Sequence, residues 1–75
     1  MERSAKEIRE CIKDILSPYI GNRKITAEDV SLALHIPYNT YLTSVRRNSI
    51  PYREILMWCR RTGLDSKNIF FKELP

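Results

Sequence analysis

The sequence predicts an all-α fold, a bundle of four to five short helices that forms a single domain over residues 1–75. Apolar residues recur at the 3.6-residue spacing of helices, and no segment alternates polar and apolar residues with the period of a strand. Helix start signals recur along the chain, two as capping-box patterns and two as Ile-Pro pairs. A chain of this length buries only ~60–65% of its unfolded surface, so the predicted core is small.

The first expected helix covers residues 4–17. Ser4 and Glu7 form a capping-box pattern, in which each side chain accepts a hydrogen bond from the other residue's backbone. Six side chains then follow at helical spacing and form one apolar stripe: Ile8, Cys11, Ile12, Ile15, Leu16 and Tyr19. Pro18 lacks a backbone N–H and clashes with the preceding turn, so we expect this helix to end near Ser17.

A second capping pattern, Thr26 with Asp29, precedes a helix expected over residues 27–34. Its apolar face consists of Val30, Ala33 and Leu34. Pro37 disfavours the helical conformation for Ile36, so this helix has room for only about two turns.

Pro37 and Pro51 themselves suit the first turn of a helix, because proline's missing N–H has no partner there. They predict a third helix over residues 38–47 and a fourth over residues 52–62. Gly63 is placed to end the fourth helix in the left-handed conformation that glycine adopts readily.

The C-terminal segment predicts one last short turn over residues 66–71, capped by Asp65 or Ser66. Its apolar side chains can either close the domain's own core or form a dimer surface: Ile69, Phe70, Phe71 and Leu74.

The predicted core combines the apolar faces of these elements: Ile8, Ile12, Ile15, Val30, Leu34, Ile36, Tyr41, Val45, Ile55, Cys59 and Ile69. Cys11 and Cys59 both lie on apolar stripes, where cysteine behaves as a small hydrophobic residue. We expect reduced, buried thiols, with a disulfide between them as the alternative. The cysteines are far apart in sequence and His35 is the only histidine, so no metal site is expected.

The net charge of +4 is concentrated in residues 37–63, because the segments on either side are neutral. Five arginines there oppose a single acid, Glu54: Arg46, Arg47, Arg53, Arg60 and Arg61. The planar guanidinium group favours recognition of phosphate or carboxylate. The alternative interpretation is a solvated face that happens to be basic.

Residues 26–47 have the residue types of a helix-turn-helix unit, two short helices joined by a tight turn. Ser31 is small enough to let the second helix cross closely, and Ile36 can fill the angle between the helices. Tyr41 and Val45 can bury one face of the second helix. Its outward side chains are polar and able to reach base edges: Tyr38, Asn39, Thr40, Thr43 and Ser44. The alternative is a structural helix with a solvated polar face.

The segment VSLALHIPYNTY, residues 30–41, resembles the helix-turn-helix core of lambda repressor-like DNA-binding domains. The runs RRNSIPY, ILMWC and TGL that follow resemble more specifically the N-terminal domain of phage lysogeny repressors. The resemblance covers roughly residues 25–72. Two positions depart from it, since His35 replaces the usual glycine of the turn and Leu42 replaces a usually polar outward residue.

The resemblance implies two sets of DNA contacts on the third helix and the segment after it. Three residues match base-reading positions: Tyr38, Asn39 and Thr43. Three match positions near the DNA backbone: Thr40, Arg46 and Arg47. We add Ser44 and Arg53 to the backbone-contacting set. The amide of Asn39 can donate to and accept from the edge of an adenine, which makes it the best candidate for base recognition.

The predicted function is sequence-specific binding of double-stranded DNA by a transcriptional regulator, with repression as the favoured role. A monomer would read few base pairs, so a homodimer on a two-fold site is expected. We expect no cofactor and no small-molecule substrate. No apolar run approaches the ~20 residues of a membrane span, and the N-terminus lacks a signal-peptide pattern. We therefore expect a cytoplasmic protein, prokaryotic or phage-encoded.

Two other functional classes remain open. A protein-binding module could keep this fold without DNA affinity and use Leu42, Trp58 and the C-terminal tail as its partner surface. An enzyme is disfavoured, because the chain has one histidine, no glycine-rich phosphate loop and no paired acids suited to a cleft.

Overall fold

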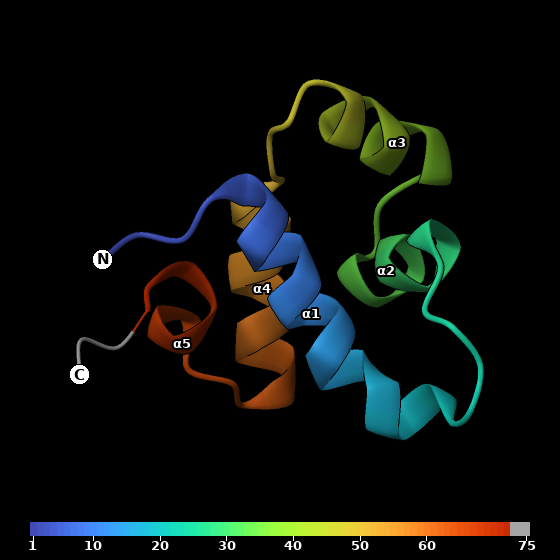
Figure 1. Ribbon diagram of the computed structural model, residues 1–75, viewed down its shortest axis with the longest axis horizontal. Helices are drawn as coiled ribbons and strands as arrows, with labels where there is room; N and C mark the ends of the chain where they lie inside the picture. The colour runs from blue at the N-terminus through green and yellow to red at the C-terminus, as the bar shows by residue number, and fades with distance from the viewer. Residues whose placement is uncertain (73–75) are drawn as a thin grey trace.

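The computed structural model describes residues 1–72, and the part of the chain it describes folds into five helices (Figure 1). In chain order they are α1 (Ala5–Ile20), α2 (Ala27–Leu34), α3 (Tyr38–Arg46), α4 (Tyr52–Thr62) and α5 (Ser66–Phe70). Helix α5 packs against both α1 and α4 on one side of the molecule, and α2 packs against the same two helices on the other side. Helix α3 lies at the end of the bundle, and among the helices its backbone approaches only α2. The predicted all-helical bundle is confirmed.

Both predicted capping boxes are present. The Glu7 N–H donates to Ser4 Oγ at 3.2 Å, and the Ser4 N–H donates to Glu7 Oε1 at 3.1 Å. The corresponding pair at α2 joins Asp29 and Thr26, at 3.3 and 2.8 Å. These bonds satisfy N–H groups that have no partner inside a helix, and they place the first residues of α1 and α2 as expected.

The predicted end of α1 near Ser17 is wrong, because the helix continues through Pro18 to Ile20. A proline removes only one hydrogen bond, and in the last turn few residues remain beyond it to be disturbed. The helix ends instead at Gly21, whose φ is 92° and whose N–H donates to the Ser17 carbonyl at 3.1 Å. A positive φ is readily adopted by glycine, so this residue rather than the proline terminates α1.

Helices α3 and α4 begin directly after Pro37 and Pro51, as predicted. Gly63 ends α4 with φ 76°, and the next N–H, of Leu64, donates to the Cys59 carbonyl at 3.0 Å. This is the bond pattern of a left-handed helix cap. Asp65 caps α5 by accepting from the Lys67 N–H at 3.0 Å.

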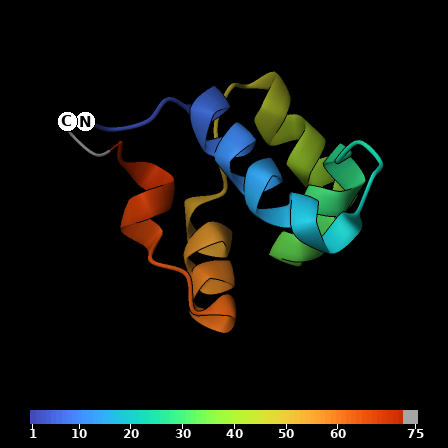
Figure 2. The same cartoon turned by 60° about the horizontal axis from the view of Figure 1, so that its bottom comes forward.

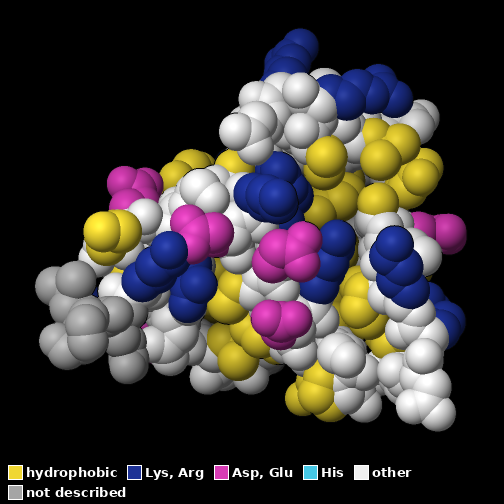
Figure 3. Space-filling model, viewed as in Figure 1, with side chains coloured by type: hydrophobic (Ala, Val, Ile, Leu, Met, Phe, Trp, Pro, Cys, Tyr) yellow, Lys and Arg dark blue, Asp and Glu magenta, His cyan; other side chains and the backbone are white. Residues whose placement is uncertain are grey.

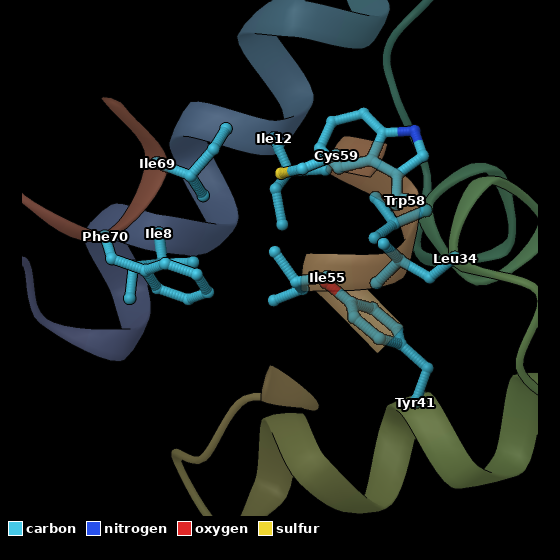
Figure 4. Packing of buried hydrophobic residues seen from close by; sticks show 10 residues of the cluster. Ile8, Ile12, Leu34, Tyr41, Ile55, Trp58, Cys59, Ile69 and Phe70 are labelled. Carbon is cyan, nitrogen blue, oxygen red and sulfur yellow. The ribbon is translucent and has the colours of Figure 1, made fainter. Parts of the chain in front are cut away.

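The core lies between α1, α4 and α5 and extends to α2 and α3 (Figure 4). Eight of the predicted core residues are buried: Ile8, Ile12, Val30, Leu34, Tyr41, Ile55, Cys59 and Ile69. Three more are half-buried against this cluster: Ile15, Ile36 and Val45. The prediction missed Trp58 and left Phe70 open between the core and a dimer surface, and both are buried. Cys59 is buried and Cys11 half-buried, and both thiols are free.

The N-terminal segment pairs with the residues that follow α5 (Figure 2). The Arg3 N–H donates to the Phe70 carbonyl at 2.8 Å, and the Lys72 N–H donates to the Met1 carbonyl at 2.7 Å. The Lys72 ammonium also forms an ion pair with Glu7 on α1. Within residues 1–72 this isolated bridge is the whole of the β structure, so both ends of the described chain are fixed to the bundle.

The core role predicted for the tail is confirmed for two of its residues. Ile69 and Phe70 belong to the core, whereas Phe71 is 50% exposed, and Leu74 lies outside the described residues.

None of the helices described is both long and apolar enough to cross a membrane.

Candidate nucleic-acid interface

The turn between α2 and α3 fixes how the two helices meet. His35 adopts the left-handed conformation with φ 58°. Its N–H donates to the Leu32 carbonyl at 3.2 Å, and the Ile36 N–H donates to the Ser31 carbonyl at 3.1 Å. These two bonds form a Schellman cap, which holds the turn although its left-handed position carries a side chain instead of glycine.

Two buried side chains attach α3 to the rest of the protein. Ser31 on α2 is 2% exposed, and its hydroxyl donates to the Glu28 carbonyl at 2.8 Å, so a small polar group is satisfied where the helices pack. Tyr41 extends from α3 into the core near Ile55 (Figure 4). Burial raises the pKa of the Tyr41 hydroxyl, and the nearby Arg9 charge opposes that shift. The inward face predicted for α3 is confirmed.

The outward face of α3 carries all three residues predicted to read bases. Tyr38 is 47% exposed, and Asn39 and Thr43 are also exposed. The Thr43 hydroxyl donates to the Asn39 carbonyl at 2.9 Å, so its proton is used within α3 and its oxygen can still accept a hydrogen bond. The helix is capped by Pro37 without any side-chain hydrogen bond, so the Asn39 amide is not used as a cap.

The residues predicted to contact the DNA backbone flank this face. Thr40 is exposed, whereas Ser44 is half-buried and its hydroxyl donates to the Tyr41 carbonyl at 2.7 Å. A shallow groove of about 310 Å³ runs along this side of α3, lined by Thr40, Thr43, Ser44, Arg47 and Ser49. Thr40 also borders a second groove, of about 420 Å³, into which Arg53 and His35 face from α4 and the turn. The two grooves place Arg47 and Arg53 on either side of Thr40.

Positive charge gathers around α3. Residues 37–53 contain no Asp or Glu, and Arg46, Arg47 and Arg53 are exposed. Lys and Arg side chains lie over this end of the molecule in Figure 3, and the acidic side chains visible in that view lie over the other helices. Within the described chain the ion pairs all lie elsewhere: Lys13–Glu10, Arg23–Asp29 and Lys72–Glu7. None of these described ion pairs involves Arg46, Arg47 or Arg53, and the nearest acid in sequence, Glu54, lines the same groove as Arg53.

Two arginines have structural partners that the sequence did not indicate. Arg61, counted in the basic segment, donates to the Ala33 carbonyl at 3.0 Å and so joins α4 to the end of α2. Arg9 on α1 donates to Asn48 Oδ1 at 3.1 Å and to the Ser49 carbonyl at 3.3 Å. Both contacts join residues far apart in sequence, and the only available signal was the position of Arg9 beside the apolar stripe of α1.

The surface proposed for a protein-binding module is not present as expected. Trp58 is 4% exposed and belongs to the core, with Leu34 of α2 close to it (Figure 4) and Ile15 and Leu16 of α1 lining the same pocket. Leu42 is half-buried. Among residues 1–72 no group of three or more His, Cys, Asp or Glu side chains is placed to hold a metal ion.

Comparison of the chain with family models, with curated proteins and with solved structures found no match.

Proposed function

We propose that this protein binds double-stranded DNA sequence-specifically and regulates transcription, with α3 inserted in the major groove. The observation that carries the proposal is the arrangement of α3, an exposed helix at the end of the bundle with a polar outward face and exposed arginines beside it. An α-helix with its side chains is ~10–12 Å in diameter and fits a major groove ~12 Å wide.

The outward side chains supply the two kinds of contact that DNA recognition needs. Tyr38, Asn39 and Thr43 can reach base edges, with the free Asn39 amide suited to adenine. Arg46 and Arg47, at the other end of α3, can bind phosphates and fix the orientation of the helix on the duplex. The grooves beside Thr40 can receive the sugar–phosphate backbone, since Arg47 borders one of them and two arginines outnumber Glu54 in the other.

The arrangement of α2 and α3 also supports the proposal that the chain resembles lambda repressor-like domains. The two-helix unit, its close crossing at Ser31 and its exposed second helix are the features that such a domain requires. A regulator of this kind represses transcription when its site overlaps a promoter, and repression remains the favoured role.

A single copy of α3 reads only a few base pairs, so we propose that the protein acts as a homodimer on a two-fold site. Phe71, half exposed beside the paired termini, is the described part of the tail available to such a contact. Two-fold symmetry predicts half-sites whose centres are ~10–10.5 base pairs apart or a multiple of that distance.

Selection of binding sites from random duplex DNA tests the proposal. The expected result is one enriched sequence, arranged as an inverted repeat, whose affinity exceeds that of a scrambled duplex by ~10³-fold or more. Affinity for both duplexes should fall steeply with salt, because binding releases counterions from the phosphates. Absence of any enriched sequence, together with salt-independent binding, would remove the proposal.

A further inference from the structure

We propose that Arg9 on α1 is a positioning residue that sets the orientation of the DNA-reading helix α3, although it does not itself contact DNA. The inference rests on the DNA-binding function proposed above. Helix α3 has few attachments to the rest of the molecule. Among the helices its backbone approaches only α2, and Tyr41 is its one fully buried side chain.

The segment after α3 contains a second attachment point. Asn48 has φ 51°, and its N–H donates to the Val45 carbonyl at 3.0 Å. The Ser49 N–H donates to the Ser44 carbonyl at 2.9 Å, which completes a Schellman cap on α3. Asparagine tolerates the left-handed conformation better than most residues, but less well than glycine, so this cap benefits from further support.

Arg9 supplies that support with both arms of its guanidinium group. Nη2 donates to the Asn48 side-chain oxygen at 3.1 Å, and Nη1 donates to the Ser49 carbonyl at 3.3 Å. One contact holds the left-handed residue and the other holds the residue after it. These two contacts, called the clamp below, join α1 to the end of α3 that carries Arg46 and Arg47. The turn at His35 fixes the opposite end of the helix.

This geometry makes Arg9 a link between the scaffold and the proposed phosphate contacts. If the cap loosens, the last turn of α3 and its arginines lose their fixed position relative to the outward residues Asn39 and Thr43. Specific binding needs all these groups held in one geometry, whereas non-specific binding needs only charge. Loss of the clamp should therefore reduce specific affinity more than non-specific affinity.

Arg9→Lys is the informative variant, because lysine keeps the charge but cannot span two acceptors with a planar fork. We expect ~3–10-fold weaker binding to the selected site, the range for one exposed charged hydrogen-bonding contact, and a smaller change on random DNA. The slope of affinity against salt should not change, because no phosphate contact is lost. In the free protein, the amide hydrogens of Asn48 and Ser49 should exchange faster, since their cap opens more often.

Two further variants separate the clamp from other roles. Asn48→Gly keeps the left-handed backbone but removes the side-chain acceptor, so Arg9→Lys should have a smaller effect in that background. Lys13→Ala removes a charge from the next turn of α1, where the only described ion pair is a surface contact of 3.7 Å to Glu10. It should reproduce neither the faster exchange nor the loss of specific affinity.

Several outcomes would overturn the proposal. Unchanged exchange at Asn48 and Ser49 in Arg9→Lys would show that the guanidinium fork does not hold the cap. Faster exchange with unchanged DNA affinity would show a cap with no role in recognition. Full binding by Arg9→Lys, with a salt slope lowered by about 0.9 in Arg9→Ala, would make Arg9 a phosphate contact instead. If the unmodified protein selects no DNA sequence, the proposed function fails first, and the exchange measurement still reports on the clamp itself.

Discussion

The first half of the molecule and the segment that follows it differ in charge and in how their helices begin. Residues 1–36 are neutral, and their helices α1 and α2 start with capping boxes whose acids also form ion pairs, Glu7 with Lys72 and Asp29 with Arg23. Residues 37–63 carry the surplus charge, and their helices α3 and α4 start at prolines without a side-chain hydrogen bond.

Because of this difference, the polar groups of the two segments have different partners. In α1 and α2 the charged and polar groups bind one another, so they fix the scaffold and present little to a partner. In α3 and α4 the first-turn N–H groups and the neighbouring arginines are left without side-chain acceptors from the protein. Free N–H groups at a helix start favour anions such as phosphate, and in α4 the first turn also carries Glu54. The first half of the molecule therefore uses its capping groups within the fold, whereas the helix starts of the second half have no side-chain cap.

The largest effect should come from the inward face of α3. Tyr41 is 3% exposed, so Tyr41→Ala should lower the free energy of unfolding by ~3–5 kcal/mol, as for other buried aromatic side chains. Tyr38→Ala, one turn earlier and 47% exposed, should change it by less than ~0.5 kcal/mol. Urea unfolding of both variants checks the pair. Similar values for the two would mean that α3 is not attached through Tyr41.

The next effect concerns the outward face. Asn39→Ala should weaken binding to the selected site by ~1–3 kcal/mol if the amide contacts an adenine edge. Binding to random DNA and the melting temperature should scarcely change, because Asn39 neither caps α3 nor contacts the core. The three quantities should be measured on the same preparation. Equal losses on both DNAs would exclude Asn39 from base recognition.

The sequence predicted most of the fold because its signals were local. Capping boxes, Ile-Pro pairs and Gly63 set the starts of four helices and the end of α4, and each acts within a few residues. Pro18 misled the prediction of α1, since the penalty for proline depends on how much helix follows it. Trp58 was missed, and the role of Phe70 was left open, because their burial depends on which elements cover them and apolar spacing alone does not give that.

Some features of the candidate site could likewise be predicted from the sequence, and others could not. The outward and inward residues of α3 could be assigned from helical periodicity, since Tyr41 identifies the buried face. The contacts of Arg9 with the segment after α3, and of Arg61 with Ala33, could not be predicted. They depend on tertiary placement, and an arginine beside an apolar stripe usually has many possible partners.

The arginines beside α3 should give a smaller effect that is equal on all DNA sequences. Arg46→Ala and Arg47→Ala should each weaken specific and random DNA binding by about the same factor, roughly 1 kcal/mol. Each should also lower the salt slope by about 0.9, one phosphate contact's share. Lys67→Ala removes the same charge from α5 and should leave the slope unaltered. An altered base preference in either arginine variant would place that residue among the base contacts.

The smallest effect belongs to the neutral half and concerns acid. Hydrogen bonds from Lys72 and from the Ser4 backbone lower the pKa of Glu7 from 4.5 to about 2. A carboxyl group with a lowered folded-state pKa stabilises the fold above its usual pKa, and this contribution is lost as the pH falls toward about 2. Glu7→Gln keeps the capping acceptor but removes the charge, so it should be slightly less stable than the unmodified protein near neutral pH and equally stable near pH ~2.

Glu10→Gln, which removes only a surface pair, should differ less over the same range. Unfolding free energies measured across this range provide the test, and a constant difference between Glu7→Gln and the unmodified protein would contradict it.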